Sequence, residues 1–110
     1  MLMKETEINF NVQLDENHIP EKIIWAAPDG GVVSAESKAI LLSVWDDKVK
    51  EALRIDLWTK EMPIDEMKRF FHQVLHSLGD SYQRATDEEE IAEEIRKFAE
   101  YFADRSGIKM

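Results

Sequence analysis

Residues 39–58 read AILLSVWDDKVKEALRIDLW, and this stretch carries the clearest structural pattern in the chain. Its first part, from Ala39 to Trp45, is apolar on both faces, as expected for a central strand. An Asp-Asp-Lys sequence then turns the chain. From Ala52 to Trp58, apolar and polar residues alternate, which is typical of a second strand. The stretch therefore predicts a β-hairpin.

The second strand of this hairpin has two different faces. Leu53, Ile55 and Leu57 share one face, and Arg54, Asp56 and Trp58 share the other. The first strand must add either Trp45 or its neighbour Val44 to the second group. Trp and Arg are enriched at protein contacts, so Trp45, Arg54, Asp56 and Trp58 form a candidate protein-interaction surface. The alternative is a half-covered sheet whose tryptophan is shielded by long side chains.

Two more strands are expected before the hairpin. Strict alternation places Ile8, Phe10, Val12 and Leu14 on one side of a first strand, and residues 22–26 form a short second strand. A Pro-Asp-Gly-Gly turn follows at residues 28–31. The segment from Val32 to Ser37 is either a loop or a single helical turn.

Two helices are expected after the hairpin. The first begins at Met62-Pro63, and the second begins at Thr86, where Thr86 and Glu89 have the spacing of a capping box. Each helix has one apolar stripe, formed by Met67, Phe70, Phe71, Val74, Leu75, Leu78 and Tyr82 in the first and by Ile91, Ile95, Phe98, Ala99 and Phe102 in the second. Strands followed by helices indicate an α+β fold. We expect a four-stranded antiparallel sheet with two helices packed on one face, in a single domain spanning residues 1–110.

Composition narrows the function classes. The 110 residues contain 14 Lys and Arg against 23 Asp and Glu, for a net charge of −9. Such a chain lacks the basic surface that nucleic acids require, and anionic membranes would repel it. The absence of cysteine excludes disulfides, thiolate metal sites and cysteine nucleophiles. The segment from Met1 to Glu7 has no apolar run of the signal-peptide kind, and no window is long enough to insert into a membrane, so we expect a cytoplasmic protein.

Two polar clusters are candidate sites. His72 and His76 are four residues apart on the first helix, with Asp80 and Asp65 on the same side, and such a row can bind a divalent metal. We favour solvated histidines that point away from the apolar stripe, and hence no metal. Residues 87–90, with Glu93 and Glu94, complement the helix dipole or, alternatively, form a docking surface for a basic partner. No residue has the context of a catalytic nucleophile, so we expect no enzymatic activity and no cofactor.

Several strings of the sequence together resemble the GldC family. They cover the chain from about Ile8 to Phe102 and comprise residues 14–17, 20–22, 29–31, 38–46, 53–60, 62–63, 65–67, 71–73 and 84–87. The most specific is LRIDLWTK at residues 53–60. The resemblance implies an accessory protein of gliding motility in Bacteroidetes-type bacteria, with no assigned enzymatic activity, cofactor or catalytic residue.

The resulting hypothesis is a non-enzymatic cytoplasmic interaction protein that supports gliding or the cell-envelope machinery behind it. Its partners would be proteins of that machinery, and a homodimer is the simplest form of self-association. The alternative is a small acidic chaperone or secretion adaptor, suggested by analogy with export chaperones that have four strands and two helices. A metal-dependent enzyme using His72 and His76 is a third, weaker hypothesis.

Overall fold

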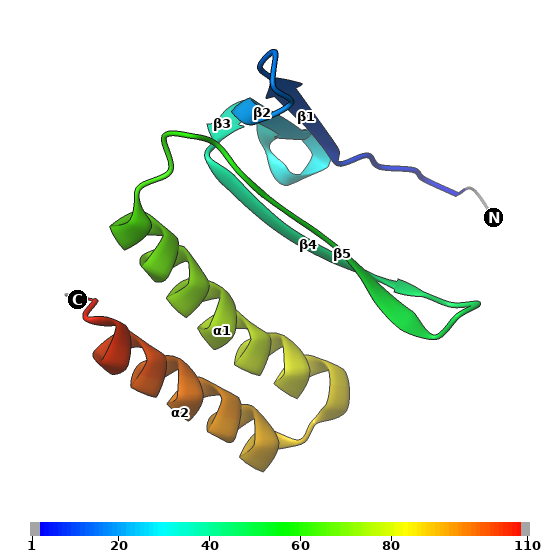
Figure 1. The fold of residues 1–110 in the computed structure, drawn as a ribbon. Coiled ribbons are helices and arrows are strands. Elements are labelled where there is room, and N and C mark those ends of the chain that lie inside the picture. Colours follow the sequence, from blue (N-terminus) through cyan, green and yellow to red (C-terminus); the bar gives the residue numbers. More distant parts are fainter. Residues whose placement is uncertain (1–2, 109–110) are drawn as a thin grey trace. The chain divides into compact units, whose positions relative to one another are not determined.

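A computed structural model describes residues 3–108, so the first two residues of the N-terminal segment considered above lie outside it, as do the last two of the chain. The chain divides into two compact units, Met1–Met62 and Pro63–Met110, which are described separately. The first unit contains the strands and the second the helices (Figure 1). The predicted α+β class is therefore confirmed.

The first unit begins with a three-stranded antiparallel sheet in the order β1-β2-β3. Its strands are β1 (Asn9–Leu14), β2 (Pro20–Ala27) and β3 (Val32–Ser37), and the short 3-10 helix η1 (Pro28–Gly30) joins the last two. Ile23 on the central strand is fully buried. Phe10 lies opposite Trp25 in the β1–β2 register, and their rings stack with centroids 6.3 Å apart. Apolar packing is thus concentrated on β2.

A separate two-stranded antiparallel sheet completes this unit. It consists of β4 (Ala39–Asp46) and β5 (Glu51–Trp58), the hairpin predicted from residues 39–58. Figure 1 shows it as a long ribbon.

The prediction of one four-stranded sheet is wrong, because residues 3–108 contain five strands that form two sheets. The missing strand is β3, for which the sequence pattern indicated a loop or a helical turn. Gly31 adopts a left-handed conformation with φ of 85°, and the chain reverses there so that Val32 lies opposite Ala27. Exposed Ser34 and Glu36 hid the strand from a hydropathy pattern. The single domain over residues 1–110 and the packing of the helices on a sheet face stay predictions.

The turn between β1 and β2 is built on Asp15. Its Oδ1 accepts hydrogen bonds from the backbone N–H groups of Asn17 (2.8 Å) and Ile19 (3.0 Å), and its Oδ2 lies 2.7 Å from Lys60 Nζ. The backbone N–H of Lys60 also donates to the carbonyl of Pro20 at 3.3 Å. The hydrogen bond from Lys60, followed by that from Ile19, lowers the pKa of Asp15 from 3.8 to about 2. Asp15 therefore connects the first sheet to the end of the second.

The second unit is a pair of helices, α1 (Ile64–Thr86) and α2 (Glu89–Ser106), which lie side by side (Figure 1). The predicted capping box at Thr86 is wrong. Thr86 stays in α1, where its hydroxyl donates to the carbonyl of Tyr82 at 2.8 Å. Asp87 then adopts a left-handed conformation with φ of 62° and ends the helix, and α2 starts after Glu88 without a side-chain cap.

Candidate interaction surface

The β4–β5 hairpin is closed by a turn that the sequence specifies locally. The Oδ1 atom of Asp46 accepts hydrogen bonds from the backbone N–H groups of Lys48 (2.9 Å) and Val49 (3.0 Å). Lys50 then takes a left-handed φ of 60°, and its Nζ lies 2.9 Å from Asp47 Oδ1. This turn fixes the pairing register of the two strands.

The register settles which first-strand residue joins Arg54, Asp56 and Trp58. Trp45 lies opposite Ala52, whereas Val44 lies opposite Leu53. Because directly opposed residues of an antiparallel pair point to the same side, Trp45 is on the face of Arg54, Asp56 and Trp58. The structure therefore places all four predicted surface residues on one face, which we call the indole face: Trp45, Arg54, Asp56 and Trp58.

The indole face is open to solvent at both ends. Trp45 is 65% exposed and Trp58 is 52% exposed. Ala39 lies opposite Trp58, and Trp45 is six positions beyond Ala39 along β4, so the two indoles are about 20 Å apart. Arg54 and Asp56 lie between them on β5. The arrangement is a broad surface with an apolar group at each end and charges in the middle.

The opposite side of the hairpin is entirely aliphatic apart from the pair next to the turn. Its members, here called the aliphatic face, are Ile40, Leu42, Val44, Leu53, Ile55 and Leu57. Val44, Leu53 and Ile55 are each at least half exposed, at 55%, 50% and 53%. A two-stranded ribbon with apolar groups on both sides is marginally stable by itself in water, so it needs packing from outside the two strands.

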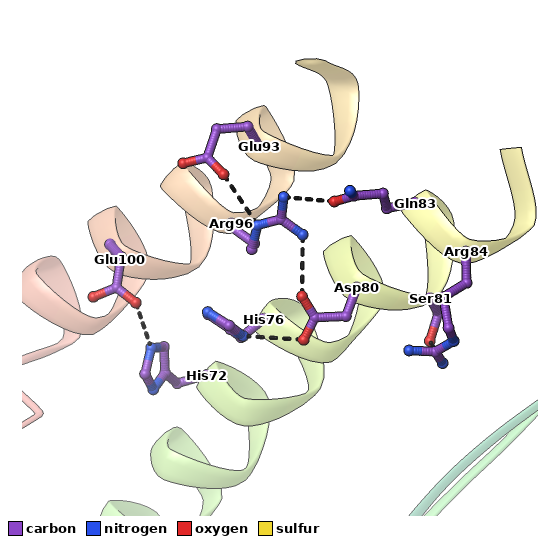
Figure 2. Close-up of polar contacts among 9 residues, drawn as sticks. All are labelled: His72, His76, Asp80, Ser81, Gln83, Arg84, Glu93, Arg96 and Glu100. Carbon is purple, nitrogen blue, oxygen red and sulfur yellow. Dashed lines mark hydrogen bonds and ion pairs between the residues drawn. The ribbon is translucent and has the colours of Figure 1, made fainter. Parts of the chain in front are cut away.

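Within the polar row on α1, His72 does not point into solvent as expected, whereas Asp65 is exposed and the side chains of His76 and Asp80 are nearly half exposed. His72 is only 7% exposed, because this side of α1 faces α2. Its Nε2 lies 3.5 Å from Glu100 Oε1 (Figure 2). No group among the described residues forms a hydrogen bond with this nitrogen. The prediction of a solvated His72 is wrong, because His72 lies against the surface of α2. Ala92, Ala99 and Ala103 line that surface, and all three are buried.

Arg96 of α2 joins the two helices by a polar network (Figure 2). Its guanidinium donates to Glu93 (3.1 Å), to Asp80 (3.0 Å) and to Gln83 (2.9 Å). The hydrogen bond to Glu93, with a further one to Asp80, raises the pKa of Arg96 above its usual value. His76 Nδ1 lies 3.6 Å from the other oxygen of Asp80. The carboxylate of Asp80 is thus shared by two helices and serves their packing.

The arrangement of these polar groups bears on the metal hypothesis. Among residues 3–108, no three His, Asp or Glu side chains come close enough together to bind one metal ion. His72 and His76 lie on the same side of α1, but each has a carboxylate of its own as its nearest acidic neighbour, Glu100 for the first and Asp80 for the second. His72 therefore contacts α2 through Glu100, whereas His76 contacts Asp80 within α1.

The acidic run at residues 87–90 lies at the start of α2. Glu89 and Glu90 occupy its first turn, where carboxylates complement the helix dipole. Glu88 accepts a hydrogen bond from the Tyr82 hydroxyl at 2.9 Å, which raises the pKa of that tyrosine. Glu93 pairs with Arg96 and Glu94 with Lys97, at 3.1 and 3.8 Å. Contacts within the helix pair therefore explain much of the acidic run without a basic partner.

Comparison with known proteins gives a match to a family model. No curated protein and no solved structure matches the chain. Within the described part of the chain, no helix has the length and apolar character that crossing a membrane requires. A family model described as "Gliding motility-associated protein GldC-like" matches residues 20–108, a stretch that contains the whole hairpin and both helices. That description concerns motility and states no enzymatic activity. The chain therefore belongs to the GldC-like family of gliding motility-associated proteins.

Proposed function

We propose that this protein is a non-enzymatic cytoplasmic accessory protein that binds a protein component of the gliding or cell-envelope machinery through the indole face. Membership of a motility-associated family supports the process. The surface is supported by one observation above all, the two large indoles of Trp45 and Trp58 that stay more than half exposed on one side of a hairpin.

The indole face has the chemistry of a protein contact. Solvent-exposed tryptophan is costly to leave uncovered, and tryptophan and arginine dominate the binding energy of many interfaces. A partner that covers Trp45 and Trp58 would also meet Arg54 and Asp56, one charge of each sign. It would then need a matching acidic and basic group to avoid burying an unpaired charge.

The link to gliding and the role of the indole face are tested separately. Deletion of the gene should reduce spreading of colonies on agar, and unchanged spreading would remove the link to gliding. In the deletion strain, a W45A/W58A variant should fail to restore spreading although it accumulates to the wild-type level. Val33→Ala is the matched control, because Val33 is an 83% exposed apolar residue on β3, away from the indole face. Full restoration by the tryptophan variant would show that the surface lies elsewhere.

A second function is favoured by the aliphatic face. Half-exposed Val44, Leu53 and Ile55 offer the apolar surface that a small chaperone or secretion adaptor presents to unfolded clients. Suppression of aggregation of a chemically denatured protein, at a few-fold molar excess, would support this function. The L53S/I55S variant would lose the suppression while the W45A/W58A variant kept it.

A further inference from the structure

The free edge of β5 is the feature that the proposed function leaves unused. β5 is hydrogen-bonded to β4 along one side only, and no other strand within residues 3–108 pairs with its second side. An edge of eight residues exposes a row of backbone N–H and C=O groups that can accept another strand. Native proteins cover or block such edges, so the question is what covers this one.

The pairing with β4 determines which backbone groups point outward. The N–H of Thr59 donates to the carbonyl of Lys38 at 2.9 Å, which continues the β4–β5 register by one pair. Hydrogen-bonded pairs alternate along an antiparallel ladder, so the odd-numbered residues of β5 use their backbone groups on β4. The even-numbered residues direct theirs to the free edge, and these are Ala52, Arg54, Asp56 and Trp58.

The sequence of this edge is complementary to itself. Its centre reads Leu53-Arg54-Ile55-Asp56-Leu57. If a second copy of β5 runs antiparallel with the two-fold axis at Ile55, Arg54 of each copy lies opposite Asp56 of the other. Leu53 then lies opposite Leu57, and Ile55 lies opposite itself. Every aliphatic residue meets an aliphatic residue, and each charge meets its opposite.

Other registers of the same two strands are worse. Moving the axis by one residue toward the start of β5 places Arg54 opposite Arg54, and moving it toward the end places Asp56 opposite Asp56. Like charges directly opposite each other destabilise a strand pair. Only the register centred on Ile55 satisfies the outward-pointing backbone groups of Arg54 and Asp56 and also pairs their charges.

Arg54 and Asp56 are available for such a contact. Both are exposed, and within the described chain neither takes part in an ion pair or a side-chain hydrogen bond. Arg54 and Asp56 are two positions apart on the same face of β5, so their side chains lie near each other. Neither side chain pairs with any other charged group of the described chain. In a dimer, a second copy of the chain would provide each of these two side chains with an oppositely charged partner.

We propose that two copies of this protein pair through the free edges of β5, in antiparallel register about Ile55, and form a continuous four-stranded sheet in the order β4-β5-β5-β4. The indole faces of both copies then lie on one side of that sheet, and the aliphatic faces lie on the other. Trp58 of each copy comes to lie opposite Ala52 of the second, a large side chain beside a small one. This inference concerns the backbone edge, so it stands independently of the process the protein serves.

Sedimentation equilibrium of the purified full-length chain tests this pairing. The wild type should be dimeric, and Arg54→Glu or Asp56→Lys should each raise the dimer dissociation constant by about tenfold or more, because each places like charges opposite each other. The decisive sample is an equimolar mixture of the two variants. In the mixed dimer the introduced glutamate faces the introduced lysine, and the remaining Arg54 faces the remaining Asp56. Affinity should therefore return to within about threefold of the wild type.

The matched control is Arg69→Glu, which makes the same charge change on the exposed side of α1 and should leave the dimer intact. Far-UV circular dichroism of each variant verifies its fold. A monomeric wild type would overturn the proposal and show that Arg54 and Asp56 instead protect the edge from pairing. A dimer that survives both single substitutions would overturn it as well. Neither result would affect the test of colony spreading, so failure of this inference is distinguishable from failure of the proposed function.

Discussion

Gly79 lies at a tight contact between α1 and α2. A Cβ atom added at this position would lie 2.8 Å from Arg96 Cγ and 3.0 Å from the carbonyl oxygen of Ala92. Real Cβ atoms do not approach other heavy atoms so closely, and the carbonyl belongs to the backbone of α2. The absence of a side chain at Gly79 therefore sets the spacing of the helices.

Gly79→Ala should lower the free energy of unfolding. Alanine gains up to about 1 kcal/mol over glycine in helix propensity, but overpacking a tight contact costs about 1–3 kcal/mol, so we expect a net loss of about 1 kcal/mol. Urea denaturation measures it. Gly30→Ala is the control, since its Cβ would meet only Ala27 Cβ at 3.9 Å. A more stable Gly79→Ala variant would show that the helices can separate at no cost.

The positions of two side chains, Trp45 and His72, could not be predicted from the sequence. Trp45 and Val44 could not be distinguished, because β4 is apolar on both faces and only the register with β5 separates them. His72 was misplaced because the buried surface of α2 consists of alanines, which a search for large apolar residues overlooks. Ala92, Ala99 and Ala103 recur at helical spacing on one side, and that pattern was the signal available.

Among the elements, the turn between β1 and β2 depends on one carboxylate. Asp15 binds two backbone N–H groups of its own turn and Lys60 from the segment after β5. Its pKa in the folded protein, about 2, lies below the ordinary 3.8. A carboxyl group with a lowered pKa stabilises the fold above its unfolded value, and this contribution is lost as the pH falls through the folded value.

Protonation of Asp15 should therefore lower the stability of the wild type between pH 4 and 2. The Asp15→Asn variant has no such carboxyl group and should lack this part of the pH dependence. The variant should be less stable at pH 6, and its difference from the wild type should shrink steadily as the pH falls from 4 to 2, as measured by urea denaturation at a series of pH values. Asp47→Asn, which removes the same charge from a 93% exposed side chain at the hairpin turn, serves as the control. A difference independent of pH would contradict this role of Asp15.

The pattern of elements was predictable to a different extent in the two units. The helices follow directly from apolar residues at helical spacing and from Pro63, which immediately precedes α1. The hairpin follows from alternation in β5. The sequence pattern did not identify β3, because Ser34 and Glu36 are polar and exposed and because the start of the strand depends on the left-handed Gly31. Without β3, the division into two sheets could not be predicted either. Alternation identifies strands, but the grouping of strands into sheets depends on turn geometry.

At the scale of the whole molecule, net charge opposes the proposed dimer. Each copy carries −9, and two such charges about 30 Å apart repel by several kcal/mol when the Debye length is about 30 Å. At physiological salt the Debye length falls to about 8 Å and most of this repulsion disappears. Salt also weakens the exposed Arg54–Asp56 ion pairs, but the free energy lost there is smaller, because such pairs contribute at most about 1 kcal/mol each.

Dimerisation should therefore tighten as salt increases from about 10 mM to about 150 mM, by about tenfold or more. Sedimentation equilibrium at several salt concentrations measures this dependence. The R54E/D56K double variant keeps the net charge and restores opposite charges across the axis, so it should show the same trend. A dimer that weakens steadily with salt would mean that local ion pairs outweigh the charge of the whole chain.

The positions of the three tryptophans have a practical consequence. Trp25 stacks on Phe10 within the first sheet, whereas Trp45 and Trp58 are surrounded largely by water. Fluorescence emission from the native chain is therefore dominated by hydrated rings, as it would be from an unfolded one. A ligand that covers the indole face removes water from those two rings and shifts their emission to shorter wavelengths. The protein thus carries its own optical signal of occupancy, and no attached dye is needed to follow it.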